Sequence, residues 1–165
     1  MGFRFNADEI FELAIQIEQN GAAFYRKAAS LQSESGNRSF LEKLALMEDG
    51  HERTFVAMRA ELPGRAKESV VFDPEGETSL YLEAMADVHG GEGSPSAAEK
   101  LTGRESMLEV VQIALGLEKK SILYYLGLRD FVPARLGQDR IDTIIKEEQS
   151  HVAQLTGIQK NLSAR

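Results

Sequence analysis

The chain of 165 residues is long enough for one domain with a sizeable core, and its 42% hydrophobic and 27% charged content is that of a globular rather than a disordered protein. It has no cysteine, which excludes disulfides, thiolate metal sites, iron–sulfur clusters and a catalytic thiol. The formal net charge of -7 disfavours nucleic acid as a partner, because an acidic surface repels a phosphate backbone.

Helix signals follow one another along the chain. The sequence NADE at residues 6–9 reads as a capping box, and apolar residues then recur at helical spacing to about residue 31. After the loop SESGN, a second predicted helix runs over about residues 37–62 and ends before Pro63. Because the loop is short, these two helices are predicted to form an antiparallel hairpin over about residues 6–62.

A segment rich in turn residues, about residues 63–101, separates this hairpin from the next long helical pattern. Its apolar spacing predicts one short helix over about residues 78–89. The segment is long enough to cross the length of a helical bundle. It is therefore predicted to be a long crossover connection.

The second half of the chain repeats the helical pattern. The sequence TGRE reads as a capping box that opens a third helix over about residues 102–131, and a fourth follows over about residues 139–162 after a turn at Gly137. These two helices are predicted to form a second hairpin over about residues 102–162. Alternating apolar and polar runs are absent, so the sequence predicts a single all-α domain, a four-helix bundle, over residues 1–165.

Two copies of one motif place polar side chains on apolar helix faces. In LALMEDGHERTF, Glu48 and His51 fall on the same stripe as the apolar residues of the predicted second helix. In IIKEEQSHVAQL, Glu148 and His151 repeat the arrangement 100 residues later. Side chains three residues apart on a helix are neighbours, so each glutamate and histidine can reach a common point.

The same offset relates further residues upstream of each motif. Glu18 in QIEQNGAAFY corresponds to Glu118 in GLEKKSILYY, and Tyr25 corresponds to Tyr125. The second hairpin therefore reads as a copy of the first. Two hairpins related by pseudo-two-fold symmetry would direct four glutamates and two histidines toward the centre of one bundle.

Four buried carboxylates cannot stay ionised and unpaired, because each would cost several kcal/mol. They must be protonated, paired with cations or bound to metal, and the inward positions offer no lysine or arginine. Two divalent ions would bring the centre near neutrality, and this ligand set suits two iron ions, with manganese or zinc as alternatives. A bundle that keeps protonated or hydrated polar residues is the competing interpretation. The predicted metal ligands are Glu18, Glu48, His51, Glu118, Glu148 and His151.

Three further residues lie near the predicted ligands. Tyr25 and Tyr125 are candidate catalytic residues, either as hydrogen-bond donors to the ligands or as oxidisable groups, and they are equally compatible with ordinary core aromatics. Glu147 precedes Glu148 but points elsewhere on the helical wheel. It is interpreted as a solvated surface residue.

The segments IEQNGAAFY, MEDGH, LEKKSILYY and EEQSH resemble the ferritin-like superfamily, and within it the rubrerythrin-like branch, over nearly the whole chain. The resemblance implies a ferritin-like four-helix bundle with a dinuclear metal site. It implies terminal ligands at Glu18 and Glu118 and bridging ligands at Glu48 and Glu148. The two histidines of the motifs would each cap one metal ion.

Two features separate the chain from typical rubrerythrins. It lacks the four cysteines of a rubredoxin-type iron site, so electrons would come from a separate donor. It also has Ser121 where rubrerythrins tend to carry an extra glutamate, and His151 where they tend to carry a glutamate. The predicted site is therefore the more symmetric kind, with four glutamates and two histidines.

The resemblance implies a di-iron oxidoreductase that reacts with peroxide or oxygen, and it also implies a homodimer. Two alternatives stay open: ferroxidase-type iron handling, and a redox-inert metal-binding bundle. The start of the chain lacks the apolar stretch of a signal peptide, and no segment approaches the roughly 20 apolar residues of a membrane span. We therefore expect a soluble cytoplasmic protein.

Overall fold

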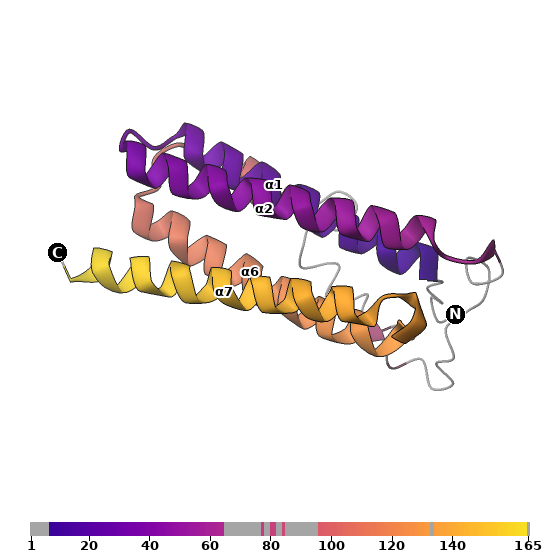
Figure 1. Ribbon diagram of the computed structural model, residues 1–165. Helices are drawn as coiled ribbons and strands as arrows, with labels where there is room; N and C mark the ends of the chain where they lie inside the picture. The colour runs from indigo at the N-terminus through magenta and orange to yellow at the C-terminus, as the bar shows by residue number, and fades with distance from the viewer. Residues whose placement is uncertain are drawn as a thin grey trace.

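Four long helices form two antiparallel pairs in the computed structural model (Figure 1). The structure describes residues 7–64, 77, 80, 81, 84, 96–132 and 134–164. The long helices are α1 (Ala7–Ser30), α2 (Ser35–Ala60), α6 (Met107–Phe131) and α7 (Gln138–Ser163). Short helix α5 (Ala97–Lys100) precedes α6, and the 3-10 helix η1 (Ala134–Leu136) precedes α7. The described ranges contain no strand, and the predicted all-α bundle of two antiparallel hairpins is confirmed.

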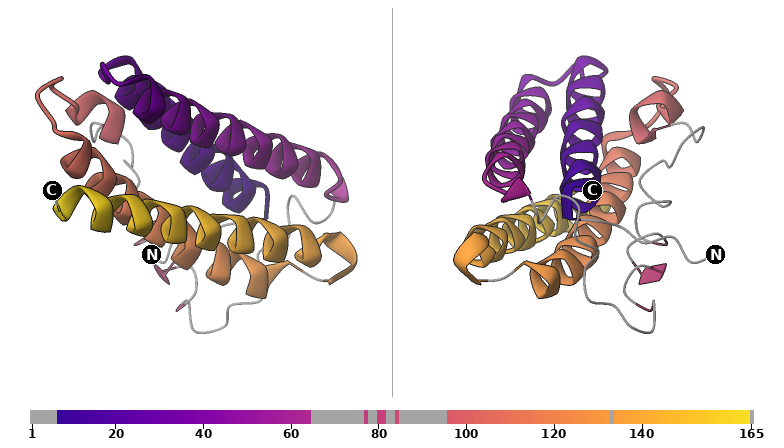
Figure 2. Two further views of the ribbon diagram at one scale, coloured as in Figure 1. Left: turned by 60° about the vertical axis from the view of Figure 1, so that its left-hand side comes forward. Right: turned by 90° about the vertical axis from the view of Figure 1, so that its right-hand side faces the viewer.

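The α1–α2 pair lies on the α6–α7 pair, and the two pairs cross at an angle (Figure 2). Helix α1 contacts α6, and α2 contacts α7. Among the described helices, none has the length and apolar character needed to cross a bilayer. The short helix predicted over about residues 78–89 lies outside the described residues, apart from residues 80, 81 and 84.

The largest difference from the predicted bounds is the start of α6, which begins at Met107 rather than near Thr102. Its N-cap is Ser106, whose Oγ accepts the backbone N–H of Glu109 (3.3 Å), while the Glu109 carboxylate accepts the Ser106 N–H (2.8 Å). The TGRE sequence forms its own hydrogen-bonded turn just before this point. Gly103 in that turn has a φ of 85°, in the left-handed region, so the helix cannot continue through it.

The Glu105 side chain closes this turn, and we predict that its carboxyl titrates unusually low. The Thr102 backbone N–H and then the Thr102 hydroxyl donate to the carboxylate, which lowers the pKa of Glu105 from 4.5 to about 2. A lowered pKa means that the stabilisation is present above pH 4.5 and is lost as the pH falls toward 2. A carboxyl-carbon NMR titration is expected to give a midpoint near 2, and Thr102→Val is expected to raise it partly, because the backbone donor remains. A midpoint near 4.5 in the unmodified protein contradicts this hydrogen-bonded turn.

The core consists of two apolar clusters, one toward each end of the bundle. The first includes Phe11, Phe55 and Tyr125, in which the Phe55 ring contacts the rings of both other residues. The second includes Phe24 and Leu155. In all four long helices the residues between these clusters include the predicted metal ligands, so the fold surrounds a polar centre with apolar packing on both sides.

Candidate metal centre

The structure brings the six predicted ligands together at the middle of the bundle. One glutamate comes from α1 and one from α6, and a glutamate–histidine pair comes from each of α2 and α7. Each of the six residues is buried, with 5% or less of its area exposed. The six residues are Glu18, Glu48, His51, Glu118, Glu148 and His151. The structure thus establishes their clustering, and their role as ligands stays a prediction.

The first group of possible ligand atoms surrounds His51. Its Nδ1 lies 3.1 Å from Glu148 Oε1 and 3.4 Å from Glu18 Oε2. Glu48 Oε2 lies 3.8 Å from the same nitrogen. Each of these four residues offers one atom to a set that lies within 4.8 Å of one another, a spacing that could hold one metal ion.

The second group surrounds His151 in the same way. Its Nδ1 lies 2.9 Å from Glu148 Oε2 and 3.4 Å from Glu48 Oε1. Glu118 Oε2 lies 3.5 Å from the same nitrogen. These four residues also offer ligand atoms within 4.8 Å of one another.

Glu48 and Glu148 belong to both groups. Each presents one carboxylate oxygen to His51 and the other to His151. A carboxylate in this position can bridge two cations, which is the arrangement of dinuclear sites in helical bundles. The geometry therefore supports binding of two metal ions.

The cluster also holds the unpaired polar atoms that a metal site needs. In the part of the chain that the structure describes, seven buried side-chain atoms lack a hydrogen-bond partner, and all seven belong to the predicted ligands. They are Glu18 Oε2, Glu48 Oε1, both carboxylate oxygens of Glu148, His51 Nδ1 and both ring nitrogens of His151. Leaving such atoms unpaired costs about 1–3 kcal/mol each, and more for charged groups. Oxygen and imidazole donors gathered in this way fit a pair of divalent cations.

The surroundings of each ligand shift its pKa and so decide which groups are favoured as charged without metal. Burial by itself lowers the pKa of both histidines, but the surrounding carboxylates raise it, to about 12 for His151. Burial raises the pKa of Glu18 and Glu118, and the neighbouring charges of Glu48 and Glu148 raise it further. Burial alone would raise the pKa of Glu48 and Glu148. Hydrogen bonding with both histidines together has the larger effect, so the pKa of both carboxyls is lowered and the ionised form is favoured. The directions of these shifts favour protonated histidines beside ionised Glu48 and Glu148, which lowers the net negative charge of the cluster without metal.

Both candidate tyrosines donate hydrogen bonds to predicted ligands across the two hairpins. Tyr25 donates to Glu118 Oε1, and Tyr125 donates to Glu18 Oε1. Burial, and then the adjacent glutamate, raises the pKa of each tyrosine, so both hydroxyls stay protonated. Each bond holds one carboxylate oxygen and leaves the other directed at the centre. The structure therefore favours the hydrogen-bonding interpretation, while a catalytic role stays a prediction.

Glu147 is a residue of the site that the sequence analysis missed. Its side chain is 47% exposed, yet its Oε2 lies 2.7 Å from His51 Nε2. Glu147 is exposed at the surface, as interpreted from the sequence, but α2 packs against α7 closely enough for its side chain also to reach His51. A difference between the two motif copies could have revealed it, since Glu147 stands where the first copy has Met47.

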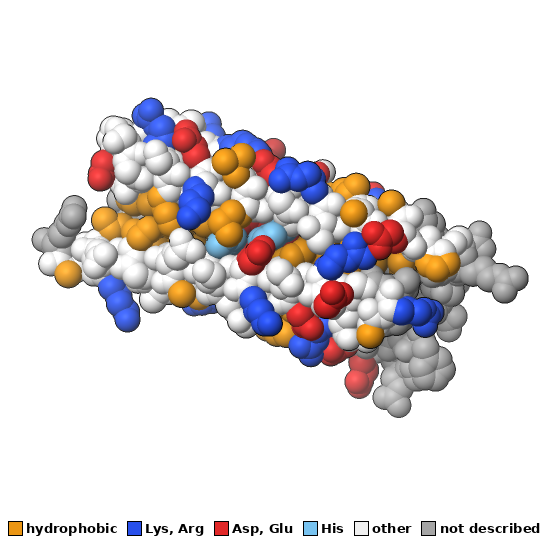
Figure 3. All heavy atoms as spheres, in the orientation of Figure 1, with side chains coloured by type: hydrophobic (Ala, Val, Ile, Leu, Met, Phe, Trp, Pro, Cys, Tyr) orange, Lys and Arg blue, Asp and Glu red, His pale blue; other side chains and the backbone are white. Residues whose placement is uncertain are grey.

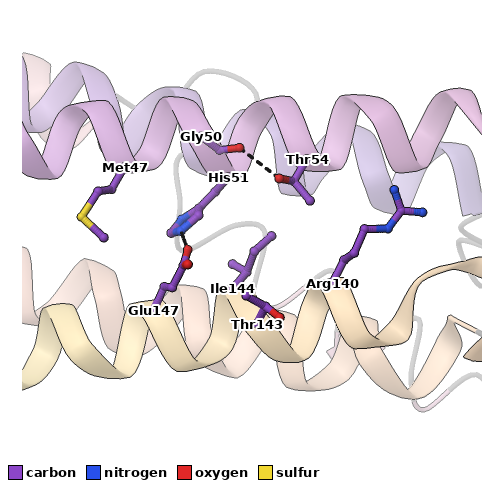
Figure 4. A pocket seen from close by; sticks show the side chains of 8 residues that line it. All are labelled: Met47, Gly50, His51, Thr54, Arg140, Thr143, Ile144 and Glu147. Carbon is purple, nitrogen blue, oxygen red and sulfur yellow. Dashed lines mark hydrogen bonds and ion pairs between the residues drawn. The ribbon is translucent and has the colours of Figure 1, made fainter.

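A surface groove between α2 and α7 opens onto His51 (Figure 4). Its volume is about 460 Å³, enough for a small molecule or a hydrated ion. Figure 3 shows histidine atoms visible at the surface midway between the hairpins, beside an acidic side chain. The groove is lined by Met47, Gly50, His51, Thr54, Arg140, Thr143, Ile144 and Glu147. Of the six predicted ligands, His51 is the one that lines this groove, so the groove reaches the edge of the buried centre.

Comparison with known proteins adds a structural relative. No family model matches the chain, and no curated protein matches it. The crystal structure of a candidate ferritin-like diiron-carboxylate protein from Thermotoga maritima is similar, with a TM-score of 0.70 and 20% sequence identity. The match covers 97% of this chain and 98% of the other. At this level of identity the likeness shows the fold, which is a ferritin-like helical bundle.

Proposed function

We propose that this chain is a dinuclear iron or manganese protein of the rubrerythrin-like kind, without a cysteine-bound iron site, and that it acts as an oxidoreductase. The observation that carries the proposal is the pair of overlapping ligand groups that share Glu48 and Glu148, with unpaired buried atoms in both. The description of the Thermotoga maritima relative as a diiron-carboxylate protein supports the same reading.

Each predicted ligand has a distinct role in the proposal. Glu18 and Glu118 would be terminal ligands, each oriented by a tyrosine hydroxyl of the opposite hairpin. Glu48 and Glu148 would be shared by the two positions, and the two histidines would each complete one of them through Nδ1. When bound, two iron ions would supply the electrons that reduce peroxide or oxygen.

The surrounding residues restrict what reaches this centre. The apolar clusters on either side exclude bulk water along the bundle axis. The α2–α7 groove admits molecules of the size of peroxide or oxygen to the His51 side. Because the chain has no cysteine for a second iron site, we propose that a separate donor supplies the electrons. We also propose that the protein is a homodimer in the cytoplasm.

Anaerobic loading with Fe²⁺ followed by desalting is expected to leave about two iron ions per chain. Elemental analysis measures this ratio directly. Stopped-flow absorbance after mixing with peroxide is then expected to show oxidation faster than that of free Fe²⁺ in the same buffer. Fewer than about one ion per chain rejects the metal site, whereas full loading with oxidation no faster than free Fe²⁺ rejects the oxidoreductase activity alone.

A further inference from the structure

We propose that the two metal positions are unequal, and that Glu147 makes the position capped by His51 bind a divalent cation first and more tightly than the position capped by His151. This inference rests on the proposed metal site and extends it to the order of filling. It assigns Glu147 as a positioning residue that acts through the imidazole of His51.

The two histidines differ in how their rings are held. His51 Nε2 lies 2.7 Å from Glu147 Oε2, while its Nδ1 faces the cluster without a hydrogen-bond partner. A neutral imidazole carries one proton on its two ring nitrogens. If that proton is on Nε2 and makes the hydrogen bond to Glu147, the Nδ1 lone pair is free for a cation. His151 is fully buried; its Nδ1 faces the carboxylates of the cluster and its Nε2 has no hydrogen-bond partner, so no acceptor comparable to Glu147 fixes its tautomer.

The difference arises at one position of the internal repeat. The 100-residue offset that relates every predicted ligand also relates Glu147 to Met47. A thioether cannot accept a strong hydrogen bond from an imidazole, so the first hairpin has no counterpart of Glu147 to offer His151. The tyrosine–glutamate bonds, by contrast, are present in both halves. The asymmetry therefore depends on one side chain.

Access to the centre favours the same position. Glu147 and His51 both line the α2–α7 groove, and Figure 4 shows the Glu147 carboxylate directed at the imidazole from the α7 side. The other charged side chain of the groove, Arg140, is paired with Glu61 through Nη1 at 3.0 Å. A cation that enters the groove thus meets the half-exposed carboxylate of Glu147 beside His51.

Titration of the chelator-treated full chain with Mn²⁺ tests the inference by calorimetry, with electron paramagnetic resonance as a second readout. The first equivalent is expected to bind at least about tenfold more tightly than the second and to give the spectrum of an isolated Mn²⁺. Glu147→Met, which copies the first hairpin, is expected to weaken the tighter step by about 10–100-fold and leave the other unchanged. Met47→Glu, which copies the second hairpin, is expected to tighten the weaker step.

A general loss of structure would give a different pattern. The melting temperature of chelated Glu147→Met is expected to stay within about 2 °C of the unmodified chain, because the side chain is half exposed. Two binding steps of equal affinity in the unmodified chain overturn this inference but not the proposed metal site. The same holds if Glu147→Met weakens both steps equally, or if it weakens neither step. A chain that takes up no Mn²⁺ overturns the proposed metal site and this inference with it.

Discussion

Glu148→Ala is expected to abolish binding of the metal pair and to leave no more than about one ion per chain. Glu148 is fully buried and neither carboxylate oxygen has a hydrogen-bond partner. Its Oε1 lies 3.1 Å from His51 Nδ1 and its Oε2 lies 2.9 Å from His151 Nδ1. One truncation therefore removes a donor from both positions. Loss of residues that merely support ligands lowers metal affinity by about 10–100-fold, so loss of this shared ligand is expected to exceed that range.

The measurement is the iron content after anaerobic loading and desalting, followed by competition with a chelator of known affinity. Glu48→Ala removes the other shared carboxylate and is expected to behave alike. Glu42→Ala is the matched control, because Glu42 is exposed on the same helix as Glu48 and is expected to keep about two ions. Unchanged loading of Glu148→Ala contradicts the bridging role.

The ligand cluster could be predicted because its members violate the apolar pattern of their helices. Glu48 and His51 interrupt an apolar stripe, and the second copy interrupts another at the same spacing. A buried carboxylate is costly enough that two such interruptions, repeated at a fixed offset, indicate a shared purpose. The structure places all of these side chains between the two apolar clusters, as the pattern required.

The start of α6 could not be predicted because two capping boxes lie next to each other. Thr102 with Glu105, and Ser106 with Glu109, both have the spacing of a helix start, and in both pairs the glutamate accepts the backbone N–H of the first residue. The Ser106 hydroxyl also accepts the N–H of Glu109, whereas the Thr102 hydroxyl accepts the N–H of Arg104 instead. The left-handed backbone at Gly103 decides between them. A residue's φ depends on how the preceding segment packs, which local spacing does not report.

Glu147 was beyond a pattern-based prediction for a different reason. Helical periodicity assigns each residue to a face, but it gives no distance between faces of different helices. Whether Glu147 reaches His51 depends on how closely α2 approaches α7, and this is a property of the assembled hairpins.

Neither hairpin contains a complete ligand group. The group around His51 contains three residues of the first hairpin and Glu148 of the second. The group around His151 contains three residues of the second hairpin and Glu48 of the first. The tyrosine–glutamate bonds also cross between hairpins. Bound metal would therefore fasten the α1–α2 pair to the α6–α7 pair at the middle of the bundle.

Metal removal is accordingly expected to lower the melting temperature by roughly 15–30 °C. At free metal roughly 1,000-fold above Kd, each site stabilises the folded chain by about 4 kcal/mol. A domain of this size shifts by about 2–4 °C per kcal/mol. Calorimetric melting of loaded and chelated protein measures the difference, and in Glu148→Ala it is expected to shrink to within about 5 °C. Ligands that come from both helix pairs must separate when the bundle unfolds, so cations bound between them must raise the melting temperature. Equal melting temperatures for chelated protein and for protein shown to hold two ions would contradict this link between the hairpins.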